Sequence, residues 1–310
     1  MSNNFKVPVV TSKVANAHSD SIWSVCWSGA DKLLTGSLDG TLKLWNSKSM
    51  SKPLCSATKQ RYGITSVVSD EDGSFAAACY NDGMVRFYQM EGDSLREDSK
   101  INVGTEDKSR TVSLSLDGQA LASGAKNGQV NIWSTADSRK QHTFHVDGNG
   151  AGESAEWIMS TAWGVGNKLA ACCKSGSVAI FDLQAQNLEH IVQAHYLPTR
   201  SVCFSTDGKL VYTASDDKNV SVFDVNAGKI VGSFQHGGMA VSVDVSPNGR
   251  HFAVGTSDGS VTLWDMGMQC TLSTYSTHID QTQAVSFDKT NAVGNRFASV
   301  GDDNIIAIYE

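Results

Sequence analysis

Apolar and polar residues alternate along most of this chain, in short runs separated by turn residues. In SVTLWD, Val261 and Leu263 lie on one face of an extended segment, and Thr262 and Trp264 lie on the other. The run SVCFSTDGKLVYTAS at 201–215 places two such segments around the turn TDGK, which is a hairpin signal. No segment shows a helical period over about ten residues, so the pattern predicts an all-β protein.

One strand pattern recurs seven times, as an acidic or polar residue, a turn residue, alternating apolar positions, an aromatic residue and a polar residue. The copies read DGTLKLWN, DGMVRFYQ, NGQVNIWS, SGSVAIFD, DKNVSVFD, DGSVTLWD and DNIIAIYE. Their aromatic residues are Trp45, Tyr88, Trp133, Phe181, Phe223, Trp264 and Tyr309. The gaps between them, of 43, 45, 48, 42, 41 and 45 residues, match the period of a four-stranded propeller blade. We therefore predict that residues 1–310 form a single seven-bladed β-propeller, with strands a to d in each blade from the centre outward.

The last repeat is one strand short. A fourth apolar run follows the earlier copies, as in GKIVGSF at 228–234, but the sequence ends at Glu310. The N-terminal run VVTSKVANAH at 9–18 is similar to the linking run LEHIVQAH at 188–195. We predict that residues 9–18 supply the outer strand of blade seven and close the ring, which pairs strand edges that would otherwise be open.

Charge and cysteine usage narrow the possible partners. The net charge of −7 disfavours nonspecific binding to nucleic acid or to anionic membranes, because either would need clustered lysines and arginines. The N-terminus shows no signal-peptide pattern, and no apolar run approaches the ~20 residues that span a bilayer. Seven scattered cysteines without a CxxC pair argue against a zinc site or a disulfide framework, and they favour a reducing intracellular compartment.

The repeats SLDG…LW and SDG…LWD, with a histidine before most of them, resemble the WD-repeat β-propellers over essentially the whole chain. Several stretches are similar to one branch of that family, the Ski8-type subunit of the Superkiller complex. These stretches are AHSDSIWSVCW at 17–27, LLTGSLDGTLKLW at 33–45, GQVNIW at 128–133, HYLPTRSVCFSTDGKLVYTASDD at 195–217 and SVGDDNIIAIY at 299–309.

The resemblance implies a non-catalytic scaffold without cofactors or metals. Its expected partners are the helical-repeat subunit and the helicase of the Superkiller complex, which feeds messenger RNA to the exosome for 3′-to-5′ decay. In animals, the similar protein is also a subunit of the polymerase-associated factor complex, which acts in transcription elongation and histone modification. We therefore expect a monomeric propeller within a hetero-complex in nucleus and cytoplasm, with no direct contact to nucleic acid or membrane.

Some residues have the composition of a hydrolase triad but recur at the blade period, which a packing device explains and a catalytic site does not. The resemblance implies that an Asp at the b–c turn bonds a His in the d–a loop, which bonds a strand-b Ser or Thr, with the Trp indole closing the network. The predicted sets are His18, Ser37, Asp39 and Trp45; His195, Ser215 and Asp217 with Phe223; and His236, Thr256, Asp258 and Trp264. Blades two to four lack parts of this set and should be locally softer.

The loops at the ends of a propeller are its usual working surfaces. We call the end with the d–a loops and b–c turns the top face, and align the repeats on the residue matching Val25. The residues two positions before the Val25 position are Trp23, Thr65, Arg110, Met159, Arg200, Val241 and Gln283. The residues two positions earlier again are Ser21, Gly63, Lys108, Trp157, Pro198, Met239 and Gln281. The residues just before the b–c turn are Leu38, Asn81, Lys126, Lys174, Asp216, Ser257 and Asp302.

From these positions we select candidate partner-binding residues by chemistry. Aromatic and polarisable side chains can anchor an interface, and carboxylates can hold a partner Arg or Lys. The candidates are Trp23, Trp157, Met159, Arg200, Asp216, Met239 and Asp302. The two tryptophans could equally be rim residues that support the blades, since Trp is enriched in cores and in interfaces.

Other functions remain as alternatives. A histone-tail reader would use the acidic residues of the top face. A cullin-ligase receptor would carry Trp-Asp-x-Arg at a blade end, and none of the blade ends has that Arg. A G-protein β-type subunit would need an N-terminal coiled coil, for which residues 1–18 leave no room. A hydrolase would need clustered carboxylates or metal ligands in the channel, and the sequence shows no such cluster.

Overall fold

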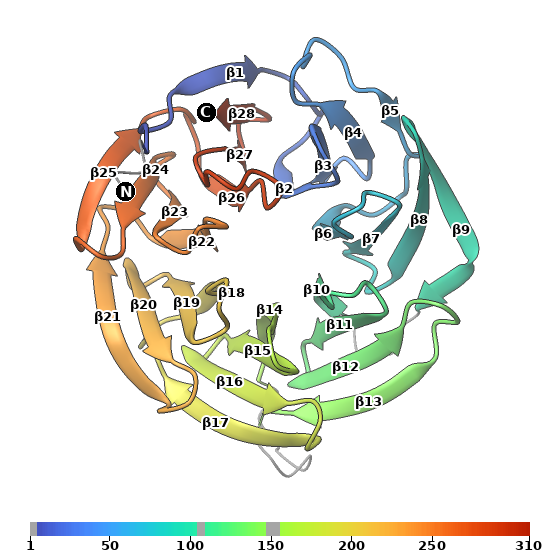
Figure 1. The fold of residues 1–310 in the computed structure, drawn as a ribbon. Helices are drawn as coiled ribbons and strands as arrows, with labels where there is room; N and C mark the ends of the chain where they lie inside the picture. The colour runs from blue at the N-terminus through green and yellow to red at the C-terminus, as the bar shows by residue number, and fades with distance from the viewer. Residues whose placement is uncertain (1–4, 104–108, 147–155) are drawn as a thin grey trace.

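The computed structural model describes residues 5–103, 109–146 and 156–310. Within them the chain forms only β-strands and turns, and its strands build seven four-stranded antiparallel sheets. The sheets stand as blades around a central channel, as the predicted fold class requires (Figure 1). None of the described segments forms a helix of the length and apolar character that crossing a bilayer would take.

The four strands of each blade are ordered from the innermost, next to the channel, to the outermost. Blades one to three are β2 (Ile22–Trp27), β3 (Lys32–Ser37), β4 (Leu42–Asn46), β5 (Cys55–Ser56); β6 (Ile64–Ser69), β7 (Phe75–Tyr80), β8 (Val85–Glu91), β9 (Ser94–Val103); and β10 (Ser109–Leu114), β11 (Ala120–Ala125), β12 (Gln129–Ser134), β13 (Lys140–His145). Blades four and five are β14 (Ile158–Gly164), β15 (Lys168–Cys173), β16 (Ser177–Asp182), β17 (Asn187–Gln193); and β18 (Thr199–Phe204), β19 (Leu210–Ser215), β20 (Asn219–Asp224), β21 (Lys229–Gln235). Blades six and seven are β22 (Ala240–Val245), β23 (His251–Thr256), β24 (Val261–Asp265), β25 (Cys270–Tyr275); and β26 (Thr282–Phe287), β27 (Phe297–Gly301), β28 (Ile306–Tyr309), β1 (Val10–Val14).

Blade seven joins the two ends of the chain, as predicted. The N-terminal strand β1 pairs antiparallel with β28, with Val10 opposite Tyr309 and Val14 opposite Ile306. The pairing continues beyond the strand, because Val9 and Glu310 exchange two backbone hydrogen bonds of 2.8 and 3.0 Å. Figure 1 shows the blue first strand lying outside the red last strand. The outer edge of β28 is therefore covered rather than open to pairing with another molecule.

Apolar residues fill the space between neighbouring blades, because the strand alternation gives each sheet two buried faces. At the junction of blades seven and one, Ile22, Val25 and Trp45 pack with Val300 and Ile306. Inner-strand serines add hydrogen bonds between several other neighbours. Ser24, for example, accepts from the backbone N–H of Val67 at 2.9 Å.

The junction of blades seven and one lacks this serine hydrogen bond, because blade seven has Ala284 at the position that Ser24 occupies in blade one. The guanidinium of Arg296 is buried there, with Nη1 at 2.8 Å from Asp31 and 3.2 Å from Asp288. Its Nε lies 2.6 Å from a carboxylate oxygen of Glu310, and Cζ lies 4.6 Å from the ring centroid of Trp27. These contacts tie the first a–b turn to the last hairpin.

Candidate protein-binding surface

Every inner strand contains a β-bulge at the same position. The pairing between strands a and b skips one residue in each blade, and the skipped residue is an unpaired extra one. The seven bulged residues are Trp23, Thr65, Arg110, Met159, Arg200, Val241 and Gln283, and all seven line the channel. Because a bulge re-aims its side chain, this ring of residues forms the rim of the channel at the top face.

A second ring lies outside the rim and is held by the backbone. In six blades, the residue before the b–c turn donates its N–H to the residue two before the bulge. These bonds link Leu38 to Ser21, Asn81 to Gly63, Lys174 to Trp157, Asp216 to Pro198, Ser257 to Met239 and Asp302 to Gln281. The structure thus places Trp157, Asp216, Met239 and Asp302 in this outer ring, and Trp23, Met159 and Arg200 in the rim. Lys108, which also belongs to the predicted outer ring, lies outside the described residues.

Rim and outer ring are joined by polar contacts in two blades. Arg200 makes two bonds of 2.8 Å to the carboxylate of Asp216, and this pairing raises the pKa of the Arg200 guanidinium. In blade seven, Gln283 donates to Asp302 at 2.9 Å. Arg200 and Asp216 therefore largely satisfy each other, so a partner cation that used Asp216 would have to displace Arg200.

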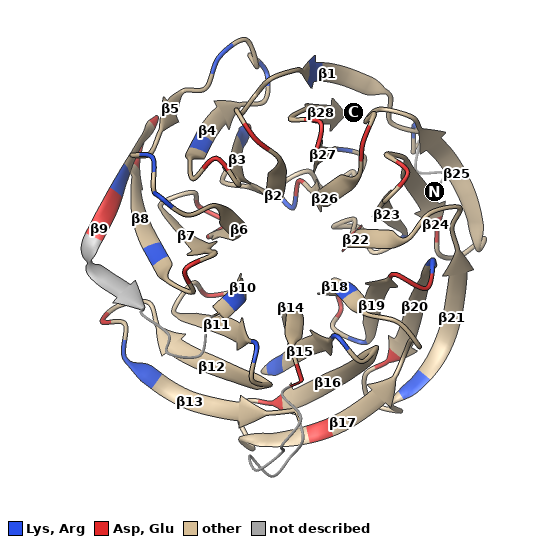
Figure 2. Cartoon of the chain, turned by 180° about the vertical axis from the view of Figure 1, so that it is seen from behind, with Lys and Arg blue, Asp and Glu red and all other residues tan. Residues whose placement is uncertain are grey.

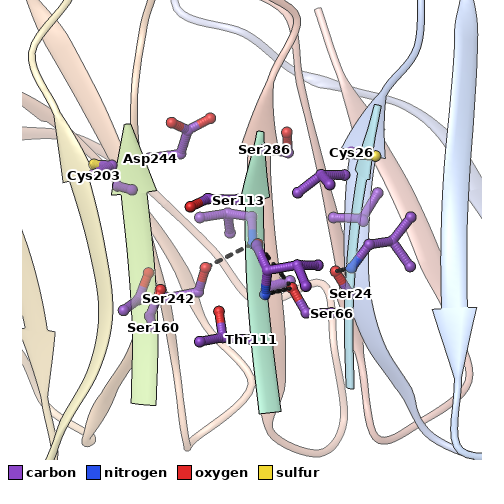
Figure 3. A pocket seen from close by; sticks show the side chains of 18 of the residues that line it. Ser24, Cys26, Ser66, Thr111, Ser113, Ser160, Cys203, Ser242, Asp244 and Ser286 are labelled. Carbon is purple, nitrogen blue, oxygen red and sulfur yellow. Dashed lines mark hydrogen bonds between the residues drawn. The ribbon is translucent and has the colours of Figure 1, made fainter. Parts of the chain in front are cut away.

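The channel behind the rim has a volume of about 570 Å³ and is lined mainly by small polar and aliphatic side chains. Figure 3 shows the hydroxyls of Ser24, Ser66 and Ser242 in its wall, with hydrogen bonds that run to neighbouring strands. The carboxylate of Asp244 accepts from Lys289 and from the backbone of Phe287. Throughout the described part of the chain, no three His, Cys, Asp or Glu residues gather where they could hold a metal ion. The hydroxyls of these three serines and the Asp244 carboxylate are thus used in joining the blades.

Three exposed apolar residues of the top face were missed from sequence. Tyr196 is 76% exposed, Ile279 is 88% exposed, and Leu197 follows Tyr196 in the same loop. They stand next to His195 and His278 in the d–a loops, where blades one and six carry Ser19 and Gly237. An apolar residue at a position that is small or polar in other repeats is the signal that could have found them.

The histidine networks form in blades one and five. The Nδ1 atom of His18 lies 3.2 Å from Asp39, and its Nε2 atom lies 2.8 Å from the hydroxyl of Thr35. The indole of Trp45 donates to the same hydroxyl at 2.9 Å. In blade five, the corresponding His195 contacts are 2.9 Å to Asp217 and 2.8 Å to Thr213.

The predicted strand-b partners Ser37 and Ser215 are wrong. The partners are Thr35 and Thr213, two residues earlier on the same face of strand b. Ser37 and Ser215 end their strands beside the turn, where each hydroxyl accepts the N–H of the turn aspartate and donates to a loop carbonyl. The histidine ring reaches past them along strand b.

The predicted network of blade six is also wrong. Thr256 bonds to Asp258 and Ser260, and not to His236. The His236 Nε2 and Trp264 Nε1 atoms are buried and have no hydrogen-bond partner among the described residues. Strand b carries Val254 at the position of Thr35, so blade six has no hydroxyl to join the two rings.

Blade seven contains a complete network that was not predicted. His278 bonds to Asp303 at 3.0 Å and to Ser299 at 2.7 Å, and Ser299 bonds to the Tyr309 hydroxyl at 2.9 Å. The tyrosine hydroxyl takes the place of an indole N–H, so this blade completes its network without a tryptophan. Blade two has another substitute, a bond of 2.6 Å between the hydroxyls of Tyr80 and Tyr88.

The electrostatics of these networks suit a packing role. Burial lowers the pKa of His18 and of His195 and outweighs the neighbouring carboxylates, which act in the opposite direction. For Asp39, burial acts to raise the pKa, but hydrogen bonds from His18, Thr41 and Ser19 together lower it by more. The net shift of the Asp39 pKa is therefore downward. The pair therefore rests as a neutral ring against a carboxylate, and both are buried away from any substrate.

Comparisons with known proteins agree with this architecture. The family model of the WD domain, G-beta repeat, matches residues 10–46 and 52–89. The WD repeat-containing protein SL1-17 of Schistosoma mansoni is 32% identical over 222 residues, which cover 69% of this chain and 70% of that protein. The WD repeat-containing protein VIP3 of Arabidopsis thaliana is 31% identical, over 62% of this chain and 63% of that protein. Protein NEDD1 of Mus musculus is 25% identical, over 64% of this chain but only 36% of that protein.

A second family model, the cytochrome D1 heme domain, matches residues 170–285, less than half of the chain. Haem iron takes an axial ligand such as His, Met, Cys or Tyr. No histidine lines the described channel wall, and burial raises the pKa of the Cys203 thiol, which keeps it protonated. His195 and His278 are held in their networks. Among the described residues, the part of the channel wall that this segment supplies therefore offers no axial ligand for a haem group.

Proposed function

The chain belongs to the WD-repeat family, and from that premise we propose that it is a non-catalytic scaffold that binds protein partners through the top face. The observation that carries the proposal is the exposure of Tyr196 and Ile279 there, at 76% and 88%. Their loops belong to blades five and seven, and the loop between them contains the pair Gly237–Gly238 and the half-buried Met239. Large exposed apolar side chains on two loops, with two glycines and a polarisable methionine on the loop between them, are suited to anchor a partner segment.

The partner that we propose is the helical-repeat subunit of the Superkiller complex, together with the complex's helicase. The resemblance at 195–217 supports this, because that stretch contains Tyr196, Arg200 and Asp216 of the top face. A helix that lays an apolar face across these loops would use Tyr196, Met239 and Ile279. Asp280, exposed beside Ile279, would face a basic residue of that helix.

A second assembly follows from the same resemblance. We propose that the chain also serves in the polymerase-associated factor complex, and hence in nucleus and cytoplasm. The alternative of a histone-tail reader is favoured by one feature, the carboxylates of Asp280 and Asp302 at the top face. Binding assays with unmodified histone-tail peptides separate the two, since a scaffold leaves those peptides unbound.

Affinity purification with quantitative mass spectrometry tests the proposal. The variants Tyr196→Ser/Ile279→Ser and Trp23→Ala/Asp302→Lys should lose a large helical-repeat protein while keeping the wild-type melting temperature. The control is Leu116→Ser/Val293→Ser, which removes apolar residues of 62% and 56% exposure from a–b turns at the opposite end of the ring. A partner set that survives both top-face variants would contradict a top-face interface.

A further inference from the structure

One sector of the top face is basic, although the chain as a whole carries a net charge of −7. Over blades three and four, the rim residue Arg110 and the b–c turn residues Lys126 and Lys174 lie in neighbouring positions of the two rings. The described residues offer none of these three cations a carboxylate within ion-pair distance. Figure 2 shows basic residues on the inner strands β10 and β18, and acidic residues in the loops near β3 and β27.

Trp157 is the centre of this basic sector. The Nζ atom of Lys126, from blade three, lies 4.7 Å from the centroid of its ring, and that of Lys174, from blade four, lies 4.6 Å from it. The backbone of Lys174 also bonds to the Trp157 carbonyl at 2.9 Å. Two ammonium groups from different blades are therefore held beside one half-buried indole, an apolar surface with positive charge next to it.

Arg110 extends the positive charge to the rim. Its Cζ atom lies 5.4 Å from the ring centroid of Trp23, and burial together with the nearby Arg200 lowers the pKa of its guanidinium. Arg200 has Asp216 as its partner, whereas Arg110 has no such carboxylate among the described residues. The one described carboxylate beside Trp157 belongs to Glu156, and it already accepts the N–H of Ser175 at 2.8 Å. Within residues 5–103, 109–146 and 156–310, Arg110, Lys126 and Lys174 thus have no carboxylate that neutralises them.

We propose that this sector, Arg110, Lys126, Trp157 and Lys174, binds an acidic segment of a protein partner. This inference rests on the proposed top-face scaffold function. It adds a second contact, in which the propeller supplies the positive charge, whereas at Asp280 it supplies the negative charge. Carboxylates of the segment would pair with the lysines and Arg110, and an apolar residue between them would pack on Trp157. Nucleic acid is disfavoured, because a phosphate chain needs a longer basic track and would meet the acidic loops near β3 and β27.

The test selects a phage-displayed library of random twelve-residue peptides on three immobilised proteins. These are the wild type, Lys126→Ala/Lys174→Ala, and the control Lys140→Ala/Lys229→Ala, which removes two exposed lysines from outer strands. Lys140 matches Lys126 and Lys174 because its Nζ atom also lies beside a tryptophan, 5.7 Å from the ring centroid of Trp133, but away from the top face. Melting temperatures establish that all three are folded.

We expect wild type and control to enrich peptides rich in Asp and Glu that bind at least about tenfold more weakly to Lys126→Ala/Lys174→Ala. Their affinity should fall as salt is raised, because the contacts are partly exposed. Peptides without an acidic bias, or acidic peptides that bind all three proteins equally, would overturn the inference. Tighter binding of a labelled single-stranded polyuridine through the same lysines would also overturn it. Retention of the helical-repeat partner alongside either failure would leave the scaffold proposal standing.

Discussion

Blades one and six carry the same four kinds of residue at the same repeat positions, yet only blade one forms the network. His18 and Trp45 share the hydroxyl of Thr35, at 2.8 and 2.9 Å. Their counterparts His236 and Trp264 each retain a buried nitrogen without a hydrogen bond to the described residues. Strand b explains the difference, because position 35 offers a hydroxyl and the corresponding Val254 offers a methyl group.

Blade six replaces the hydrogen bonds with aromatic packing. The ring of Trp264 stacks on Phe252 at 6.1 Å and meets Phe234 edge-on at 5.2 Å. His236 lies 5.5 Å from the same indole, also edge-on. Such pairs contribute roughly 0.5–1.5 kcal/mol beyond the area they bury, so the blade is cohesive without the polar network. In these two blades, one residue of strand b therefore decides whether a hydroxyl joins the histidine to the tryptophan.

The prediction with the largest expected effect concerns the closed ring that holds both blades. Deleting residues 1–17 removes β1 and leaves the edge of β28 unpaired. We expect loss of cooperative unfolding and of solubility, because an open apolar edge pairs with other molecules. Urea unfolding and light scattering measure this. A truncated chain that melts like the full-length protein would disprove closure by β1.

The second prediction concerns the histidines. His18→Ala, or Asp39→Ala, should lower the free energy of unfolding by about 1–3 kcal/mol, because buried partners lose their hydrogen bonds. His236→Ala should cost less, about 1 kcal/mol or below, since its Nε2 has no hydrogen-bond partner among the described residues. Denaturant titrations of the variants provide the values. Equal losses at the two sites would show that the hydrogen bonds of His18 add no stability over the unbonded His236.

A further difference should appear on acidification. Burial lowers the pKa of His236 to about 4, below its unfolded value of about 6.5. Between these pKa values the unfolded state binds more protons than the folded state. The free energy of unfolding is therefore not reduced by His236 above pH 6.5, and it declines as the pH falls toward 4. In His236→Leu, the slope of unfolding free energy against pH should be shallower by up to about 1.4 kcal/mol per pH unit. An unchanged slope from pH 7 to 4 would mean that His236 does not titrate on unfolding.

The fold could be predicted almost completely, because each blade is a local unit with its own turn and alternation. Closure by residues 9–18 followed from counting strands, and the rim residues followed from alignment on Val25. The bulge that turns Trp23 and its six counterparts toward the channel mouth could not be deduced, since it depends on how strands a and b pair.

The networks were harder to predict than the fold. Ser37 and Thr35 lie on one face of the strand, and the sequence alone does not show how far the His18 ring reaches. The exposure of Tyr196 and Ile279 was missed for a related reason. An apolar residue in a loop can pack inward or stand in solvent, and only the arrangement of neighbouring blades decides between the two.

The central structural claim is that the hydroxyl at this position of strand b decides whether the histidine and the tryptophan are joined in blades one and six. The most direct measurement is the free energy of unfolding of Thr35→Val and of Val254→Thr. Thr35→Val should destabilise by about 2–4 kcal/mol, because it leaves His18 Nε2 and the Trp45 indole unpaired. Val254→Thr should stabilise by about 1 kcal/mol, because it supplies a partner for His236 and Trp264. Changes of the same sign at both sites would contradict the claim.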